Sequence, residues 1–449
     1  MLCAIPIEIV NRELDAVLYL ALHLAGRGLP TLMGDYMVRR WVFRFDKGKP
    51  VIYFDQDQSL RDNQAVLDAG GVVFNLNQEG LVLEDSLEQA DYALAVRALT
   101  MLFAWGEAGR RNILRRIPED RHSLVKVTGH PSFDLANERF VPFYRDPEII
   151  AAHGEGHIQI NTNFSYANLK MDLDRYIKML SGMDEWKIYG DKAVQEYVWK
   201  LHDFQAGLLD KYIELAGVLA DAFPDRHVVF RPHPMENRDR YVQAFRSLPN
   251  VFVDNAKPVR NWLASAGHVV HCDCTTGMEA LLMGRPVIGY RPVENAELTN
   301  RLFAGIGVPA DTPEAVAEAV RAGDMPVEMR RAQLATLSPY LANLEESAAG
   351  RIADYAASCT SPDKVWLPRP LRWTERLECF RKHVSKLIRA RQPGHNGRKV
   401  RYALEKFPPT NVAVLIDKVR RLREAEPSLP AVRVEQVALN TFLMVPEKG

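Results

Sequence analysis

The feature that most constrains the fold is an alternation of short apolar runs with stretches of helical periodicity. In the first third of the sequence the apolar runs fall at 2–10, 51–54, 72–74, 102–105 and 125–127. Apolar residues at helical spacing follow at 14–25 and again at 60–69. Apolar runs without polar alternation are typical of strands buried on both faces, so the pattern predicts a parallel sheet covered by helices on both sides.

A second series follows an irregular stretch at 134–154. Strands are predicted at 158–161, 228–230, 251–253, 269–271 and 287–289, and helices at 204–223, at 259–266 and from Thr275 or Thr276. Because single cores stop growing at roughly 250 to 300 residues, the two series are expected to form two domains. We predict a Rossmann-like N-terminal domain at 1–150, a second Rossmann-like domain at 151–345 and a helical extension at 346–449. Two doubly wound α/β domains with the ligand in a cleft between them form the GT-B arrangement.

Charge and cysteine content narrow the class of protein. The 57 Lys and Arg residues balance the 57 Asp and Glu residues, so no whole-molecule field points to a nucleic-acid partner. The five cysteines are too few and too scattered for a secreted disulfide scaffold. Charges interrupt the first apolar stretch, and no apolar run approaches the roughly 20 residues that cross a bilayer. A cytoplasmic protein is expected, with the cytoplasmic face of the inner membrane as an alternative location.

The segment 372–406 is basic and is interleaved with apolar residues, which predicts an amphipathic helix. Two interpretations remain open. The helix packs its apolar stripe on the rest of the protein and shows its charges to water, or it is attracted to an anionic membrane surface as a peripheral contact.

The segment Arg231-Pro232-His233-Pro234 directly follows a predicted strand, and Glu236 lies just beyond it. The two prolines stiffen the chain, so Arg231 and His233 are expected at the carboxyl end of the strand. A guanidinium and an imidazolium both suit the phosphate of a departing nucleotide. The alternative is a proline-rich turn with an exposed histidine.

A second candidate segment joins a strand to a helix at Thr275-Thr276-Gly277-Met278-Glu279. Either threonine can cap the helix, whose free amides form an anion site. Gly277 would let a phosphate approach the backbone, and Glu279 could accept hydrogen bonds from a ribose. An ordinary capped helix is the alternative.

Other strand ends supply further candidates. Glu79 could be the general base that deprotonates an acceptor, or a solvated loop residue. Acceptor contacts are expected from Arg12, Glu13 and Asp15, and sugar contacts from Asn161 and Asn163.

No metal site is expected. The ligand types at His268, His271, Cys272 and Cys274 are spaced too closely along one strand to close a tetrahedron. The Asp-x-Asp triplets at Asp55 and Asp172 match a metal-dependent transferase pattern, but such triplets are common by chance.

Six ordered segments give the chain a resemblance to the bacterial surface carbohydrate biosynthesis protein family over about residues 1–330. They are Ile5-Pro6-Ile7-Glu8 with Arg12-Glu13-Leu14-Asp15, Glu79-Gly80, Phe103-Ala104-Trp105-Gly106-Glu107, Ile160-Asn161-Thr162-Asn163-Phe164, Arg231-Pro232-His233-Pro234 and Cys274-Thr275-Thr276-Gly277-Met278-Glu279-Ala280. The His-Pro pair is similar to the motif of sialic acid, Kdo and CDP-glycerol transferases. The resemblance implies a CMP-linked 2-keto sugar acid such as Kdo as donor. Asp273 departs from the small or amide residue common in the family.

These observations predict an inverting, metal-independent glycosyltransferase that needs no cofactor and releases CMP. Glu79 would take the acceptor proton, while His233 and Arg231 stabilise the leaving nucleotide. The donor would be a nucleotide-sugar bound by the domain at 151–345, and the acceptor would be a bacterial surface glycan or glycolipid bound by the domain at 1–150. The alternatives are a CDP-glycerol-type polyol-phosphate transferase, a nucleotide-sugar 2-epimerase and a non-catalytic nucleotide-sugar-binding scaffold.

Overall fold

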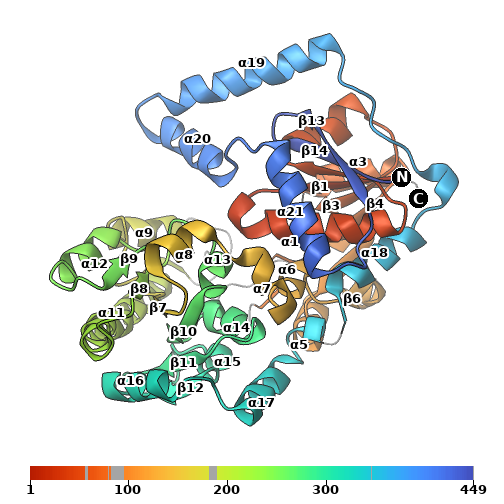
Figure 1. Ribbon diagram of the computed structural model, residues 1–449. Coiled ribbons are helices and arrows are strands. Elements are labelled where there is room, and N and C mark those ends of the chain that lie inside the picture. Colours follow the sequence, from red (N-terminus) through yellow and green to blue (C-terminus); the bar gives the residue numbers. More distant parts are fainter. Residues whose placement is uncertain (56–58, 79, 82–95, 182–189, 345, 448–449) are drawn as a thin grey trace. The chain divides into compact units, whose positions relative to one another are not determined.

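The computed structural model describes residues 1–55, 59–78, 80–81, 96–181, 190–344 and 346–447 (Figure 1). Among these residues, unit 1 combines the chain up to Leu135 with everything from Ser338 onward, and unit 2 spans Ala136–Leu337. Along the chain, the boundaries between the units fall near residues 135 and 338. The boundaries predicted from the sequence were 150 and 345. The segment after 338 belongs to unit 1 and is not a separate extension.

Unit 1 is built on an eight-stranded sheet with the order β13-β14-β2-β1-β3-β4-β5-β6. Strands β1 to β6 are parallel, and the order reverses beside β1. The bounds are β1 Leu2–Pro6, β2 Thr31–Gly34, β3 Val51–Asp55, β4 Val72–Asn75, β5 Met101–Ala104, β6 Val125–Val127, β13 Val432–Ala438 and β14 Thr441–Pro446. The β13–β14 hairpin joins the parallel strands by antiparallel pairing of β14 with β2, so the C-terminal segment is not wholly helical as predicted.

The helices of unit 1 surround this sheet. Helix α1 (Val10–Gly26) is buried along most of its length because α6, α18 and α21 all contact it. The other helical elements are α2 Met37–Arg40, the π-helix η1 Trp41–Phe45, α3 Leu60–Asp68, η2 Val96–Ala98, α5 Glu107–Leu114, η3 Glu119–Leu124, α6 Pro131–Asp134, η5 Ala342–Leu344, α18 Ala348–Ser358, η6 Pro362–Lys364, α19 Trp373–Ala390, α20 His395–Lys406 and α21 Val412–Ala425. The buried carboxylate of Asp134 accepts hydrogen bonds from the amides of Ala348 and Ala349 at 2.9 and 2.8 Å, which ties the returning chain to unit 1.

Unit 2 is built on a six-stranded parallel sheet with the order β12-β11-β10-β7-β8-β9. Numbered along unit 2, this is the 3-2-1-4-5-6 order of dinucleotide-binding folds, with its switch point between β7 and β10. The bounds are β7 His157–Asn161, β8 Val228–Arg231, β9 Val251–Val253, β10 Ala266–His271, β11 Val287–Tyr290 and β12 Val308–Ala310. The prediction of two doubly wound Rossmann-like α/β domains is confirmed.

The helices of unit 2 are η4 Glu138–Phe140, α7 Val141–Tyr144, α8 Pro147–His153, α9 Leu173–Ser181, α11 Gly190–Ala222, α12 Arg238–Ala244, α13 Val259–Leu263, α14 Thr275–Leu282, α15 Arg301–Ala304, α16 Pro313–Ala322 and α17 Val327–Leu337. The core lies where α11 and α16 cover the sheet, around Leu215, Leu219 and Val316. Helix α11 begins well before the predicted position 204, and α9 occupies part of the stretch 164–200 that had no predicted role. Within the described part of the chain, no helix is long and apolar enough to cross a membrane.

Candidate functional site

The candidate site lies at the carboxyl ends of three adjacent strands of unit 2. Strand β7 lies between β8 and β10, and Asn161, Arg231 and His271 end these strands. Asn161 and Arg231 are direct partners across the β7–β8 pair. Because ligands of doubly wound sheets bind at this edge, beside the switch point, the fold brings together the separate segments that the sequence singled out.

Arg231 is a buried cation with donor capacity left over. Its Nη2 donates to the carbonyl of Lys257 at 2.6 Å, while its buried Nε has no hydrogen-bond partner among the described residues. Burial lowers the pKa of Arg231 to about 10, and the nearby Asp254 and Glu279 oppose this shift. The guanidinium therefore stays charged at neutral pH, as an anion-binding group requires.

His233 is held as a neutral hydrogen-bond donor. Its Nδ1 lies 3.1 Å from the hydroxyl of Ser165 and accepts the amide hydrogen of Met235 at 3.3 Å. Burial, with the charges of Arg231 and Lys170, lowers the pKa of His233. With Nδ1 accepting, the neutral ring carries its proton on Nε2. The sequence suggested a cationic imidazolium; the structure supports a neutral N–H donor next to a charged arginine.

Glu236 is only 1% exposed and organises the loops around His233. Its carboxylate accepts from the hydroxyl of Thr162 at 2.9 Å, the amide of Phe164 at 2.9 Å and the amide of His233 at 3.2 Å. The hydroxyl of Tyr241 is a further donor. These contacts join the loop after β7 to the loop after β8, so they account for a residue that the sequence assigned to donor binding.

Helix α14 presents its N-terminus at the end of β10. The helix starts at Thr275 with Cys274 as its N-cap, one residue before the threonines that were predicted to cap it. A thiol is a weaker acceptor than a hydroxyl, so the positive end of the helix dipole is poorly neutralised. Thr275 is exposed and Thr276 half-buried, which leaves this first turn accessible to an anion.

Glu279 forms an ion pair that the sequence did not reveal. Its Oε2 lies 2.6 Å from Nε of Arg260 on α13, and the two side chains are 14% and 12% exposed. Arg260 also contacts the hydroxyl of Tyr144 at 3.3 Å. The pair braces α14 against α13 and α7 beside the candidate site.

Gly277 is packed against the imidazole of His271. A Cβ at this position would lie 2.3 Å from Cε1 of His271, far inside van der Waals contact. His271 is fully buried and contacts the carbonyl of Ile306 through Nε2 at 3.1 Å. The glycine is therefore required by the packing of strand against helix, whereas the sequence suggested room for a phosphate.

The burial of His271 predicts a pH-dependent stability. Burial lowers its pKa from 6.5 to about 4. The unfolded chain then binds the proton first, so this stabilisation is complete above pH 6.5 and is lost as the pH falls toward 4. We expect wild type to lose about 3 kcal/mol more unfolding free energy between neutral pH and the folded-state pKa than His271→Gln, which keeps a donor for Ile306. Urea unfolding at both pH values measures this difference.

The matched control is His202→Gln, on the surface of α11. It should leave the acid dependence of wild type nearly unchanged. Equal acid sensitivity of His271→Gln and wild type would contradict the assignment of this loss to His271.

The remaining predicted residues belong to unit 1 or lie outside the described residues. Glu79 is among the residues that the structure does not describe. The carboxylate of Glu13 accepts from the amides of Glu8 and Ile9 before α1, at 3.0 and 3.3 Å. Arg12 lies 3.4 Å from Glu13. Asp15 is paired with Lys418 of α21 at 2.7 Å. These three side chains help to hold unit 1 together.

Three further polar residues lie at or after the strand ends of unit 2. Asn163 is exposed next to the site, while Asn161 is buried and accepts from Gln159 at 2.9 Å. Asp273, the departure from the resembled family, accepts from the amide of Asn300 at 2.9 Å, and burial raises its pKa. It therefore positions the loop before α15.

The possible metal ligands on β10 have other neighbours. His268 contacts Arg226 at 3.2 Å and the carbonyl of Gly323 at 3.1 Å. Within the described ranges, no group of three His, Cys, Asp or Glu side chains is arranged to hold a metal ion.

Comparison with known proteins gives similar structures but no family. No family model matches the chain, and no curated protein matches it. Similar solved structures include Methanocaldococcus jannaschii UDP-GlcNAc 2-epimerase in complex with UDP-GlcNAc and UDP, at 12% identity and a TM-score of 0.44, covering 80% of this chain and 100% of that one. The UDP co-structure of S. aureus MnaA has 12% identity and a TM-score of 0.46, with 80% and 98% covered. UDP-GlcNAc 2-epimerase from Neisseria meningitidis, bound to UDP-GlcNAc, has 13% identity and a TM-score of 0.43, also with 80% and 98% covered.

These comparisons contradict the main functional prediction. Two of these three structures are of UDP-GlcNAc 2-epimerases, and a relation to Kdo or sialic acid transferases is not shown. The inverting glycosyltransferase with a CMP-linked donor is therefore withdrawn.

Proposed function

We propose that unit 2 binds the phosphates of a nucleotide-sugar at the ends of β7, β8 and β10, and that the chain epimerises the sugar at C2. The observation that carries the proposal is the pairing of two anion-binding features on either side of β7. Arg231 ends β8 and His233 follows it, while the poorly capped N-terminus of α14 follows β10. Two neighbouring phosphates need two such positions, one with a full charge and one with backbone amides.

The unpaired donors near β7 support a polar ligand. The Nε of Arg231 and the Nδ2 of Asn161 are both buried, and neither has a hydrogen-bond partner among the described residues. Buried donors without partners are rare in folded proteins because each costs about 1–3 kcal/mol. Phosphate or sugar oxygens would satisfy them.

The contacts in unit 1 favour a reaction without an acceptor. The three side chains expected to bind an acceptor, Arg12, Glu13 and Asp15, are engaged within unit 1 around α1 and α21. Epimerisation consumes no second substrate. The C2–H bond breaks as its electron pair expels the nucleotide from C1 and leaves a C1–C2 double bond. The nucleotide then returns to C1 while a proton adds to the opposite face of C2, so no atom is gained or lost.

Incubation in heavy water tests this proposal directly. UDP-GlcNAc, the ligand in two of the similar structures, is the first substrate to try. We expect proton NMR to show the C2 epimer, with deuterium from solvent at C2. Stabilisation by UDP without any turnover would instead indicate a binding scaffold, and neither stabilisation nor turnover with any nucleotide-sugar would contradict the proposal as a whole.

Removing the His233 donor should slow the reaction. We expect His233→Ala to reduce turnover by about 10²-fold, the effect of losing one donor that stabilises developing charge. His233→Gln, whose amide can present an N–H, should recover part of the rate. His202→Ala, a surface histidine of the same unit, is the control and should retain wild-type turnover. Undiminished turnover in His233→Ala would assign His233 to loop structure alone.

A further inference from the structure

Helix α19 turns its apolar side to solvent. Within its 18 residues, Trp373, Leu377, Phe380, Leu387 and Ile388 lie on one side of the helix and form one stripe, which the half-buried Val384 completes at three- and four-residue spacing. These side chains are 73%, 40%, 65%, 43% and 59% exposed, in that order. A surface helix normally buries its apolar stripe against the core, so α19 is inverted relative to that rule. The sequence left open whether this stripe packs on the enzyme, and the structure places it outside.

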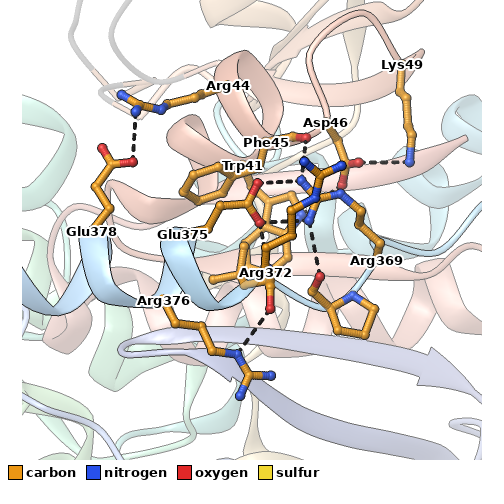
Figure 2. Close-up of polar contacts among 12 residues, drawn as sticks. Trp41, Arg44, Phe45, Asp46, Lys49, Arg369, Arg372, Glu375, Arg376 and Glu378 are labelled. Atoms are coloured by element: carbon orange, nitrogen blue, oxygen red, sulfur yellow. Dashed lines mark hydrogen bonds and ion pairs between the residues drawn. The ribbon is translucent and has the colours of Figure 1, made fainter.

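The polar side of α19 is what fastens it to unit 1. Arg369 donates two hydrogen bonds to the carboxylate of Glu375, and Glu378 forms an ion pair with Arg44 (Figure 2). The N–O distances are 2.6 and 2.7 Å for the first pair and 2.8 Å for the second. Arg40 also pairs with Glu378, and the amine of Lys386 lies 3.4 Å from the ring centre of Tyr36. These contacts fix the rotation of the helix about its axis, so the apolar stripe cannot turn inward without breaking them.

The exposed side of α19 is also positively charged. The two acidic residues of the helix, Glu375 and Glu378, are the ones neutralised by arginines on the inner side. Arg376 and Arg381 border the apolar stripe on its two sides and are exposed. Arg372 and Arg391 are exposed basic residues at the two ends of the helix, while Lys382 and Arg389 lie on the other side, with Tyr36 and Lys386. A partner for this face must accept apolar side chains and supply negative charge.

We propose that α19 binds in the plane of a membrane surface that contains anionic lipids, with its apolar stripe among the acyl chains and its arginines at the headgroups. A helix of this length spans about 27 Å, which suits an interfacial helix with a large polar face. A second copy of the chain is disfavoured, because a symmetric contact through this stripe would bring the same arginines against each other. Lipid phosphates pair with those arginines, and the acyl region takes the apolar side chains.

Vesicle co-sedimentation of the full-length chain tests the proposal. We expect binding to vesicles of phosphatidylcholine with phosphatidylglycerol, weaker binding to phosphatidylcholine alone, and weakening by salt. The triple variant Trp373→Ser, Phe380→Ser, Ile388→Ser should bind at least about a hundredfold more weakly, because three apolar side chains no longer leave water. Arg376→Gln with Arg381→Gln should weaken binding about 20-fold or more, at low salt only.

The matched control carries serine at Val242, Val293 and Val327, which are also exposed but lie on unit 2. It should bind like wild type, and both triple variants should keep the wild-type circular dichroism because all six side chains are at the surface. Failure of wild type to bind anionic vesicles would overturn the proposal, as would undiminished binding by the α19 triple variant. A dimer that this variant abolishes, without vesicle binding, would show a self-association surface instead. Turnover of nucleotide-sugar in solution is independent of all these outcomes.

Discussion

Replacing Glu236 by alanine is expected to destabilise unit 2 by about 4 kcal/mol. The substitution leaves two backbone donors, the amides of Phe164 and His233, buried without an acceptor. Each unsatisfied buried donor costs about 1–3 kcal/mol, and the removed side chain adds a cavity. The hydroxyls of Thr162 and Tyr241 lose the same acceptor. Urea unfolding, with hydrogen exchange of the β7 and β8 peptides to locate the effect, measures this loss.

The isosteric change Glu236→Gln separates hydrogen bonding from charge. Its amide oxygen can face the two backbone donors from the Oε1 position, and its amide nitrogen can donate to the two hydroxyls near Oε2, since hydroxyls accept as well as donate. We therefore expect a cost of about 1 kcal/mol or less. A loss as large as that of the alanine variant would mean that the negative charge itself is needed. Glu318→Ala, on the exposed side of α16, is the control and should stay within about 0.5 kcal/mol of wild type.

We expect the two Glu236 variants to differ in nucleotide binding as they do in stability, with alanine more damaging than glutamine. Glu236 receives the amide of His233 and joins the loops after β7 and β8, so its removal frees the donor that is proposed to contact the nucleotide-sugar. The alanine variant should begin its thermal melt folded, but UDP should no longer raise its unfolding temperature. The glutamine variant should retain it.

The sequence predicted those parts of the fold whose strands are recognisable from their apolar composition. Buried parallel strands such as β3 and β8 are continuous apolar runs, which the sequence displays openly. Strand β2 begins with a threonine and ends with a glycine after only four residues, so no run marks it. The β13–β14 hairpin was missed because β13 is an edge strand with polar residues and few buried side chains, and the whole stretch 346–449 was predicted to be helical.

The candidate site could be located from the residues at strand ends. The roles of its individual residues could not be predicted, because they depend on partners far away in the sequence. Glu236 takes its donors from a loop that lies 72 and 74 positions earlier in the chain, and Glu279 is paired with Arg260 of another helix. A pattern within one segment cannot show such contacts. Acidic residues next to a phosphate motif looked like ligand contacts for that reason, and the structure shows what else holds them.

Gly277 is the position where the sequence and the structure offer different reasons for the same residue, and Gly277→Ala distinguishes them. We expect this variant to destabilise unit 2 by about 3 kcal/mol, because the added methyl group would lie 2.3 Å from the rigid, buried ring of His271. Gly217→Ala in α11 is the matched control: nothing lies within 4 Å of its added methyl group, so it should gain about 0.5 to 1 kcal/mol from helix propensity.

The two reasons predict opposite combinations of stability and binding. If packing decides, the double variant His271→Ala, Gly277→Ala should be more stable than the sum of the two single losses allows, since the methyl group then enters the space left by the imidazole. If the glycine instead admits a phosphate, Gly277→Ala should unfold like wild type and lose its stabilisation by UDP. The urea midpoint and the thermal shift with UDP, measured on the same preparations, distinguish the two roles. Gly277 either allows β10 and α14 to pack closely, or leaves space in which the phosphate of a nucleotide binds.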